Sequence, residues 1–109
     1  MNLKGSLPLL VLHVLAHGPN HGYAIAATIR RLSEGVLEFR EGTLYPALHT
    51  LEAQGLIETF EEVIAEGRPR RIYRLTEAGA RALERERAAW RQYSRAINAV
   101  LDTFPRGSQ

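Results

Sequence analysis

The sequence lacks cysteine altogether and contains only one tryptophan and one methionine in 109 residues. Without cysteine the chain has no disulfide scaffold, no cysteine-ligated zinc and no thiol nucleophile, and this composition agrees with a reducing cytoplasm. The most apolar stretch, residues 7–15, is interrupted by His13 and is too short to cross a bilayer. We therefore expect a core helix here and no membrane span.

Neither sign of charge is in large excess, since 14 lysine and arginine residues are matched by 12 aspartate and glutamate residues. A net charge of +2 is only a weak indication of nucleic-acid binding, although the isoelectric point is about 9.4. The distribution of charge is more informative, because four basic residues fall within seven positions: Arg68, Arg70, Arg71 and Arg74. With 45% apolar residues, a chain of this length is expected to form one modest core.

The sequence has few groups that could perform catalysis. It has no nucleophile beside a partnered base, no glycine-rich phosphate loop and no paired acidic residues in a predicted cleft, so we expect neither an enzyme nor a cofactor. His13 and His17 have the spacing of a helical metal pair, yet no nearby cysteine, aspartate or glutamate supplies a third ligand. Gly18-Pro19 separates them from the next histidine, His21. We therefore predict no metal site.

Capping and terminating residues predict two helices at the start of the chain. The first begins at a Ser6 cap, has Pro8 in its first turn and ends before Gly18-Pro19. The second begins at an Asn20 cap and ends at Gly35. Both helices carry apolar residues at helical spacing, so each is expected to bury one face.

A third helix is predicted after an extended connector at residues 36–39. It runs from about Gly42 to Gln54, and Pro46 requires that it start near residue 42 or 43, because proline is tolerated only in a first turn. Its inner stripe consists of Leu44, Leu48 and Leu51.

The second half of the chain is predicted to form a hairpin and a long helix. Residues 56–63 and 70–75 are rich in β-forming side chains, and the turn residues 65–69 join them. Thr76 then caps a final helix that reaches about Asp102. The predicted fold class is mainly α (α+β), a winged helix-turn-helix with three helices, a two-stranded β-hairpin wing and a long C-terminal helix. We divide it into a DNA-binding domain (1–76), a dimerisation helix (77–104) and a disordered tail (105–109).

The third helix and the hairpin have the residue types of a DNA-binding surface. In a helix-turn-helix, the helix after the turn enters the major groove, where uncharged polar side chains contact base edges. Arginine suits phosphate because its planar fork donates two parallel hydrogen bonds. Each feature alone has an ordinary explanation: a leucine stripe as core, an arginine run as a solvated loop, Tyr45 as a packing residue. Their ordered combination predicts DNA contacts by Thr43, Tyr45, Pro46, His49, Arg68 and Arg70.

Four segments, in this order and spacing, are distinctive as a set: His21–Ile25, Gly42–Leu48, Leu51–Ile57 and Gly67–Gly79. With them the chain resembles the PadR family of transcription regulators over nearly its whole length. The resemblance implies a winged-helix dimer whose recognition helix enters the major groove and whose wing grips the backbone. It implies that Tyr45 is the family's characteristic tyrosine, and that the last helix is the single dimerising helix of the short subgroup. Glu41 and Glu52 would repel phosphate, so we leave them off the binding face.

The last helix has apolar residues at intervals of seven, namely Leu83, Trp90, Ile97 and Phe104. The charged Glu86, at another position of the expected seam, does not fit this pattern. A monomer of this size has no obvious room for such a stripe, so a partner helix is expected to bury it. The predicted dimerisation residues are Leu83, Trp90, Tyr93, Ile97 and Val100. A homodimer presents two recognition helices to double-stranded DNA, so we expect a pseudo-palindromic operator with half-sites about 10 base pairs apart or a multiple of that.

Trp90 has two alternative roles. It can be a packing residue, or it can stack a small aromatic effector, as the family resemblance implies for a tryptophan of this helix. Phenolic acids are the effectors of other family members, and Arg87 or Arg91 could pair with them. A rival for the whole chain is a winged-helix protein-interaction module that binds an acidic partner. That module would need an acidic or wholly apolar outer face on the third helix, and the sequence offers neither.

Overall fold

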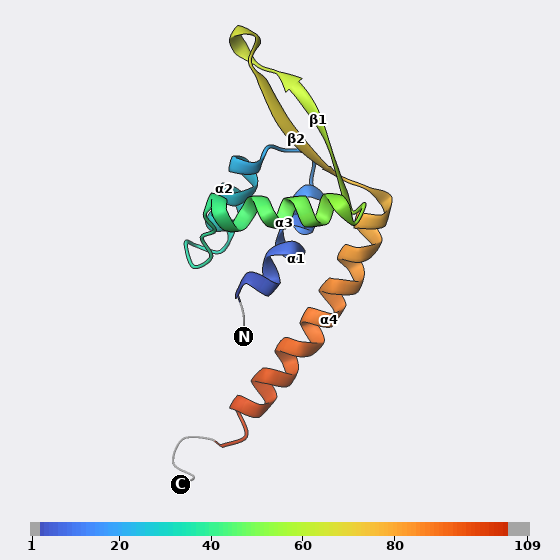
Figure 1. Ribbon diagram of the computed structural model, residues 1–109. Helices are drawn as coiled ribbons and strands as arrows, with labels where there is room; N and C mark the ends of the chain where they lie inside the picture. The colour runs from blue at the N-terminus through green and yellow to red at the C-terminus, as the bar shows by residue number, and fades with distance from the viewer. Residues whose placement is uncertain (1–2, 105–109) are drawn as a thin grey trace.

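The computed structural model describes residues 3–104, which form four α-helices, a two-stranded antiparallel sheet and a short 3-10 turn (Figure 1). The elements in chain order are α1 (Leu3–Leu15), α2 (Gly22–Leu32), α3 (Glu41–Ala53), β1 (Ile57–Val63), the turn η1 (Ala65–Gly67), β2 (Pro69–Leu75) and α4 (Glu77–Leu101). This architecture confirms the predicted winged helix-turn-helix. The predicted tail, residues 105–109, lies outside the described residues.

The first two helices begin at residues other than the predicted caps. Helix α1 starts at Leu3 instead of Ser6, so Pro8 lies in its second turn. Asn20 does not cap α2, because its backbone pairs with the free edge of β2, where it donates to and accepts from Tyr73 at 3.1 and 2.8 Å. The next residue, His21, is the cap, and its Nδ1 accepts from the Ala24 amide at 3.3 Å. A contact distant in sequence therefore decides this boundary.

Helix α3 starts at Glu41, one residue before the predicted position, and Pro46 is its sixth residue. The expectation that Pro46 lies in the first turn was therefore wrong. Pro46 lies on the exposed side of the helix, where water can solvate the carbonyl that its missing N–H leaves unpaired. The predicted inner stripe is confirmed, since the exposed fractions are 2% for Leu44, 0% for Leu48 and 2% for Leu51.

The core lies where α1 meets the inner faces of α2 and α3 and the base of the hairpin. Its fully buried side chains include Leu7, Leu12, Ile25, Leu44, Leu48 and Ile57. Leu83 belongs to the same core and is only 3% exposed. It is therefore not available to a dimer seam, because the first turns of α4 already pack against α1. This corrects the prediction that Leu83 starts the dimerisation stripe.

Two elements project from this core, the hairpin at one end and α4 at the other (Figure 1). The chain extends over 66 × 27 × 22 Å and has a radius of gyration of 16.9 Å. A globular chain of this length would have a radius of about 13 Å. Within residues 3–104, no helix is both long and apolar enough to span a membrane. The hairpin and α4 therefore offer surfaces that their own chain does not cover.

The start of α4 is fixed at two places. The Oγ1 atom of Thr76 caps the helix by accepting from the Gly79 amide at 3.0 Å, as predicted. Gly79 lies directly against the Leu56 carbonyl, so a Cβ at position 79 would collide with backbone. Two turns further along, Arg87 Nη2 lies 2.9 Å from Nδ1 of His13 on α1. Burial, followed by the charges of Arg87 and His17, lowers the pKa of His13, which favours a neutral ring at this contact.

Candidate nucleic-acid interface

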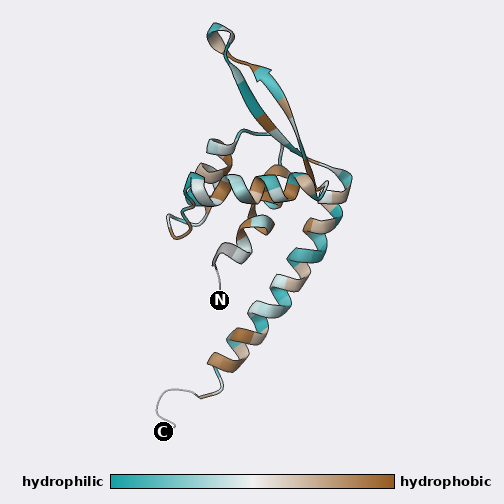
Figure 2. Cartoon of the chain, in the orientation of Figure 1, coloured by the Kyte–Doolittle hydropathy of each residue, from teal (hydrophilic) through white to brown (hydrophobic). Residues whose placement is uncertain are grey.

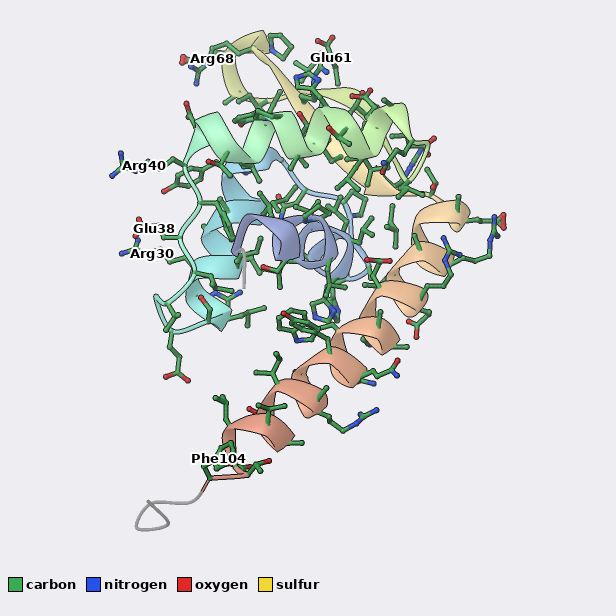
Figure 3. The ribbon with its side chains drawn as sticks, turned by 60° about the horizontal axis from the view of Figure 1, so that its bottom comes forward. Arg30, Glu38, Arg40, Glu61, Arg68 and Phe104 are labelled. Atoms are coloured by element: carbon green, nitrogen blue, oxygen red, sulfur yellow. The ribbon has the colours of Figure 1, made fainter. Side chains whose placement is uncertain are left out.

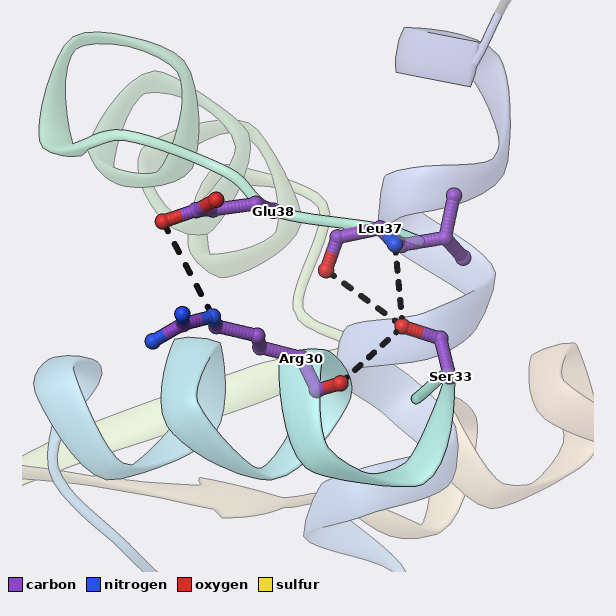
Figure 4. A network of polar contacts seen from close by, with 4 residues as sticks. All are labelled: Arg30, Ser33, Leu37 and Glu38. Atoms are coloured by element: carbon purple, nitrogen blue, oxygen red, sulfur yellow. Dashed lines mark hydrogen bonds and ion pairs between the residues drawn. The ribbon is translucent and has the colours of Figure 1, made fainter. Parts of the chain in front are cut away.

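The turn between α2 and α3 is held by a small polar network (Figure 4). The Ser33 hydroxyl accepts from the Leu37 amide at 2.9 Å and donates to the Arg30 carbonyl at 3.2 Å. Across the same turn, Arg30 Nε lies 3.9 Å from a Glu38 carboxylate oxygen in an exposed ion pair. These contacts tie the end of α2 to the extended connector and so fix where α3 begins.

Tyr45 packs across the start of α2. A Cβ at position 22 would lie only 2.6 Å from the hydroxyl oxygen of Tyr45 and 2.9 Å from the nearest ring carbon. Gly22 is therefore required for the two helices to approach each other. Tyr45 is half-buried in this contact, so it stabilises the α2–α3 pair in addition to facing the surface.

The outer face of α3 is mostly uncharged. Its exposed side chains include Pro46, His49 and Thr50, whereas Thr43 is half-buried at the margin of this face. Glu52 turns away from it, since its carboxylate accepts from the Thr59 hydroxyl on β1 at 3.2 Å. Glu41, in the first turn, is exposed. The face is neither acidic nor wholly apolar, so it lacks the feature expected of the rival interaction module.

A hollow of about 420 Å³ brings three of the predicted residues together, Tyr45 and His49 from α3 and Arg70 from the wing. Its other lining residues were not predicted: His21, Gly22, Tyr23, Arg71 and Tyr73. Burial raises the pKa of Tyr73, against the opposing effect of Arg71, so its phenol stays neutral near pH 7. Thr43, Pro46 and Arg68 do not line this hollow. The segments that carried the family resemblance contain all of the missed residues, which was the available signal.

A larger hollow of about 540 Å³ lies on the other side of Tyr45, between α2 and the start of α3. Arg30, Arg40 and the 77% exposed Tyr23 contribute to its lining. Figure 3 shows Arg40 pointing away from the molecule at the start of α3, with the Arg30–Glu38 pair beside it. Neither arginine was predicted as a contact, because they stand ten residues apart in sequence and form no visible cluster there.

Three of the wing's four arginines lie on β2, and three of its four glutamates lie on the neighbouring strand β1. The register places Glu58 opposite Arg74, Glu61 opposite Arg71 and Glu62 opposite Arg70. Two of these three pairs form ion pairs, Arg70–Glu62 at 2.7 Å and Arg74–Glu58 at 2.9 Å. Arg74 also lies over the Phe60 ring, 5.1 Å from its centre. Two of the four arginines in the cluster found in the sequence are therefore paired with glutamates of the neighbouring strand.

The charge balance of the wing follows from the same residues. Residues 57–75 contain four arginines, at 68, 70, 71 and 74, and four glutamates, at 58, 61, 62 and 66. Their formal charges cancel. Arg68 stands at the tip (Figure 3) and forms no ion pair with any described residue. Counting the glutamates of the preceding strand and of the turn would have revealed this balance from the sequence.

The far end of α4 is a second exposed surface, and Figure 2 shows its last turns as hydrophobic. The exposed fractions are 46% for Tyr93, 42% for Ile97 and 66% for Val100. Trp90 is half-buried, with its ring centre 5.8 Å from that of Tyr93. It borders a hollow of about 200 Å³ shared with Gly5, Ser6, Leu9, Glu86, Ala89 and Tyr93. Its own α1 therefore covers part of Trp90 and shares this hollow with Tyr93, whereas Ile97 and Val100 do not line it.

A recognition-type helix, an adjoining hairpin and a long projecting helix together define the class of winged-helix transcription regulators. Residues 11–85 match the PadR-like family of transcriptional regulators. Transcriptional regulator Rv3488 of Mycobacterium tuberculosis is 40% identical over 86 residues, which is 79% of this chain and 79% of that protein. The chain belongs to the PadR-like family, and it is a transcriptional regulator rather than an enzyme.

Solved structures show the same fold. A transcriptional regulator from Clostridium thermocellum matches with a TM-score of 0.82 and 28% identity, covering 89% of this chain and 94% of that chain. A PadR family transcription regulator from hypervirulent Clostridium difficile matches with a TM-score of 0.77 and 31% identity, covering 89% and 99%. These matches extend over α4, so the long helix belongs to the shared architecture.

Proposed function

We propose that this protein is a cytoplasmic repressor that binds a pseudo-palindromic operator as a homodimer. Residues Thr43, Tyr45, Pro46 and His49 of α3 contact the major groove, and Arg68 and Arg70 of the wing contact the backbone. The observation that carries the proposal is the hollow where α3 and the wing meet, since Tyr45, His49 and Arg70 line it together. A DNA backbone passing this hollow would meet both elements at once.

The exposed apolar end of α4 supports the homodimer. Tyr93, Ile97 and Val100 repeat at spacings of four and three residues, the pattern of a helix seam, and all are exposed in the single chain. Together with Trp90 they form the proposed contact between copies. Burying such side chains against a second α4 removes apolar surface from water, which favours association. Two joined copies place two α3 helices on one DNA duplex.

A small aromatic or phenolic effector at Trp90 is a further part of the proposal. The half-buried indole beside Tyr93 offers a flat apolar surface next to a hollow. The exposed Glu86 in the same hollow disfavours an anionic compound, so a neutral aromatic compound fits this site better than a phenolic acid.

The proposal is tested by selecting DNA fragments that the purified protein retains and then measuring their binding across a salt series. We expect an enriched sequence with two-fold symmetry, and a steep fall in affinity as salt rises. Ile97→Glu should abolish both self-association in sedimentation and preference for the symmetric site, because a charge at the seam opposes burial. Ala80→Glu, which adds the same single charge at an exposed position in the early part of α4, is the matched control. A protein that binds no duplex at low salt would support the interaction module instead.

A further inference from the structure

The wing contains a carboxylate, that of Glu62, which accepts a hydrogen bond from one of the wing's own arginines, Arg70. Glu62 and Arg70 stand directly opposite each other on β1 and β2. An oxygen of the carboxylate lies 2.7 Å from Nη2 of the guanidinium, at the distance of a short charge-assisted hydrogen bond. A carboxylate and a phosphate use the same donors of an arginine. The N–H group of Arg70 that donates to Glu62 is therefore not available to a DNA phosphate until that hydrogen bond opens.

The guanidinium of Arg70 is incompletely satisfied in this arrangement. Its Nε is buried and has no hydrogen-bond partner among the described atoms. Leaving a buried donor unpaired is unfavourable, so this position of the side chain is not strongly held. The ion pair is also accessible to water, since the side chains of Arg70 and Glu62 are 40% and 47% exposed. Exposed ion pairs contribute little to stability, so an incoming phosphate can displace this one.

The position of Arg70 makes the exchange relevant to binding. Arg70 lines the hollow that also contains His49 and Tyr45 of α3. A phosphate held there lies next to the recognition helix. Because the formal charges of the wing cancel, the wing gains no general attraction for DNA from its four arginines. The affinity of the wing for DNA phosphates therefore depends on which of its arginines are separated from their glutamate partners.

We propose that Glu62 competes with DNA phosphate for Arg70 and thereby weakens the grip of the wing on any duplex. The inference rests on the proposed function, because it concerns the same DNA-binding surface. An Arg70 that is free of Glu62 would neutralise one DNA phosphate and so release about one counterion from the DNA. In the native protein, an Arg70 that stays paired with Glu62 neutralises no phosphate, so this counterion is not released. Glu62 thus lowers both the affinity and its dependence on salt.

The test compares Glu62→Gln with Glu61→Gln on a random-sequence duplex of about three helical turns across a salt series. Glutamine keeps the size of the side chain and removes the charge. Glu61 lies on the same strand, but no ion pair joins it to any described residue, so Glu61→Gln removes the same charge without freeing an arginine. We expect Glu62→Gln to bind about three- to five-fold tighter than the native protein. Its salt slope should steepen by up to about 0.9, and Glu61→Gln should show much smaller changes.

A second pair of variants ties the effect to Arg70. In an Arg70→Ala background, Glu62→Gln should bind no more tightly than Glu61→Gln does in that background, because the arginine that it would free is absent. Equal changes in Glu62→Gln and Glu61→Gln would overturn the inference and reduce Glu62 to a general negative charge. A native protein that binds no duplex at any salt would instead refute the proposed function. Thermal unfolding of each variant verifies that the wing remains folded.

Discussion

Helix α3 and the wing both carry predicted DNA contacts, but they are built in opposite ways. Three fully buried leucines anchor α3, and the side chains it exposes are mostly uncharged. The wing touches the core only near its base, through residues such as Ile57 and Tyr73, and its charges are numerous and balanced. A rigid, uncharged face suits discrimination between bases, whereas exposed and exchangeable charges suit adjustment of overall affinity.

The largest effect is expected at the anchor of α3. Leu48→Ala removes a fully buried side chain and should lower the free energy of unfolding by about 2–5 kcal/mol, measured by urea denaturation. His49→Ala, one residue further on and exposed, should change it by less than about 0.5 kcal/mol. Similar losses in the two variants would mean that the inner and outer faces of α3 are not as distinct as the burial indicates.

His49→Ala should instead affect discrimination between DNA sequences. Loss of one base-edge contact is expected to cost about 1–3 kcal/mol on the selected operator, with little change on random duplex. Titration of both duplexes at one salt concentration measures the difference. An equal loss on both duplexes would indicate that His49 contacts the DNA backbone. The proposed division of roles, with α3 reading the base sequence, would then be wrong.

Arg68→Ala should show the complementary behaviour. Arg68 forms no ion pair with described residues, so its removal should weaken binding to operator and random duplex alike and flatten the salt slope by about 0.9. Arg81→Ala removes the same charge from the exposed surface of α4 and is the matched control. A loss confined to the operator would show that the wing reads sequence.

The smallest effect is expected for Tyr45→Phe, which keeps the ring against Gly22 and removes only the hydroxyl. The free energy of unfolding should change by less than about 1 kcal/mol. If the hydroxyl donates to DNA, the free energy of operator binding should weaken by about 0.5–1.5 kcal/mol. Calorimetric unfolding and operator titration separate the two. Unchanged operator affinity would leave Tyr45 with the packing role alone.

The order of elements was predictable because each signal is local. Three leucines at helical spacing identified α3, and Thr76 followed by a long helical pattern identified α4. The cap of α2 was not predictable, because the backbone of Asn20 pairs with Tyr73 on β2, more than fifty residues away in sequence. Local preferences cannot report such a pairing.

The site was predictable only in part for the same reason. The arginines were visible as a cluster, but their glutamate partners follow from the hairpin register, which the geometry of the turn sets. The fate of Leu83 depended on where α4 crosses α1, so a heptad position alone could not distinguish the chain's own core from a partner's surface. The other residues of that stripe, from Trp90 to Val100, stay a prediction of the dimer contact.

The contacts of Gly79 with the Leu56 carbonyl and of Arg87 with His13 fix α4 to the rest of its own chain, so that the two would move as one body. The 25 residues of α4 span about 37 Å, so rotating one copy by ~10° about a seam at the far end of this helix would shift the opposite end by ~6 Å. That displacement approaches the rise of two base pairs along the DNA axis, each about 3.4 Å. In two copies joined at the far end, even a small tilt would alter the distance between their α3 helices. In the proposed dimer, a compound bound beside Trp90 would release DNA through such a rotation, without touching the DNA.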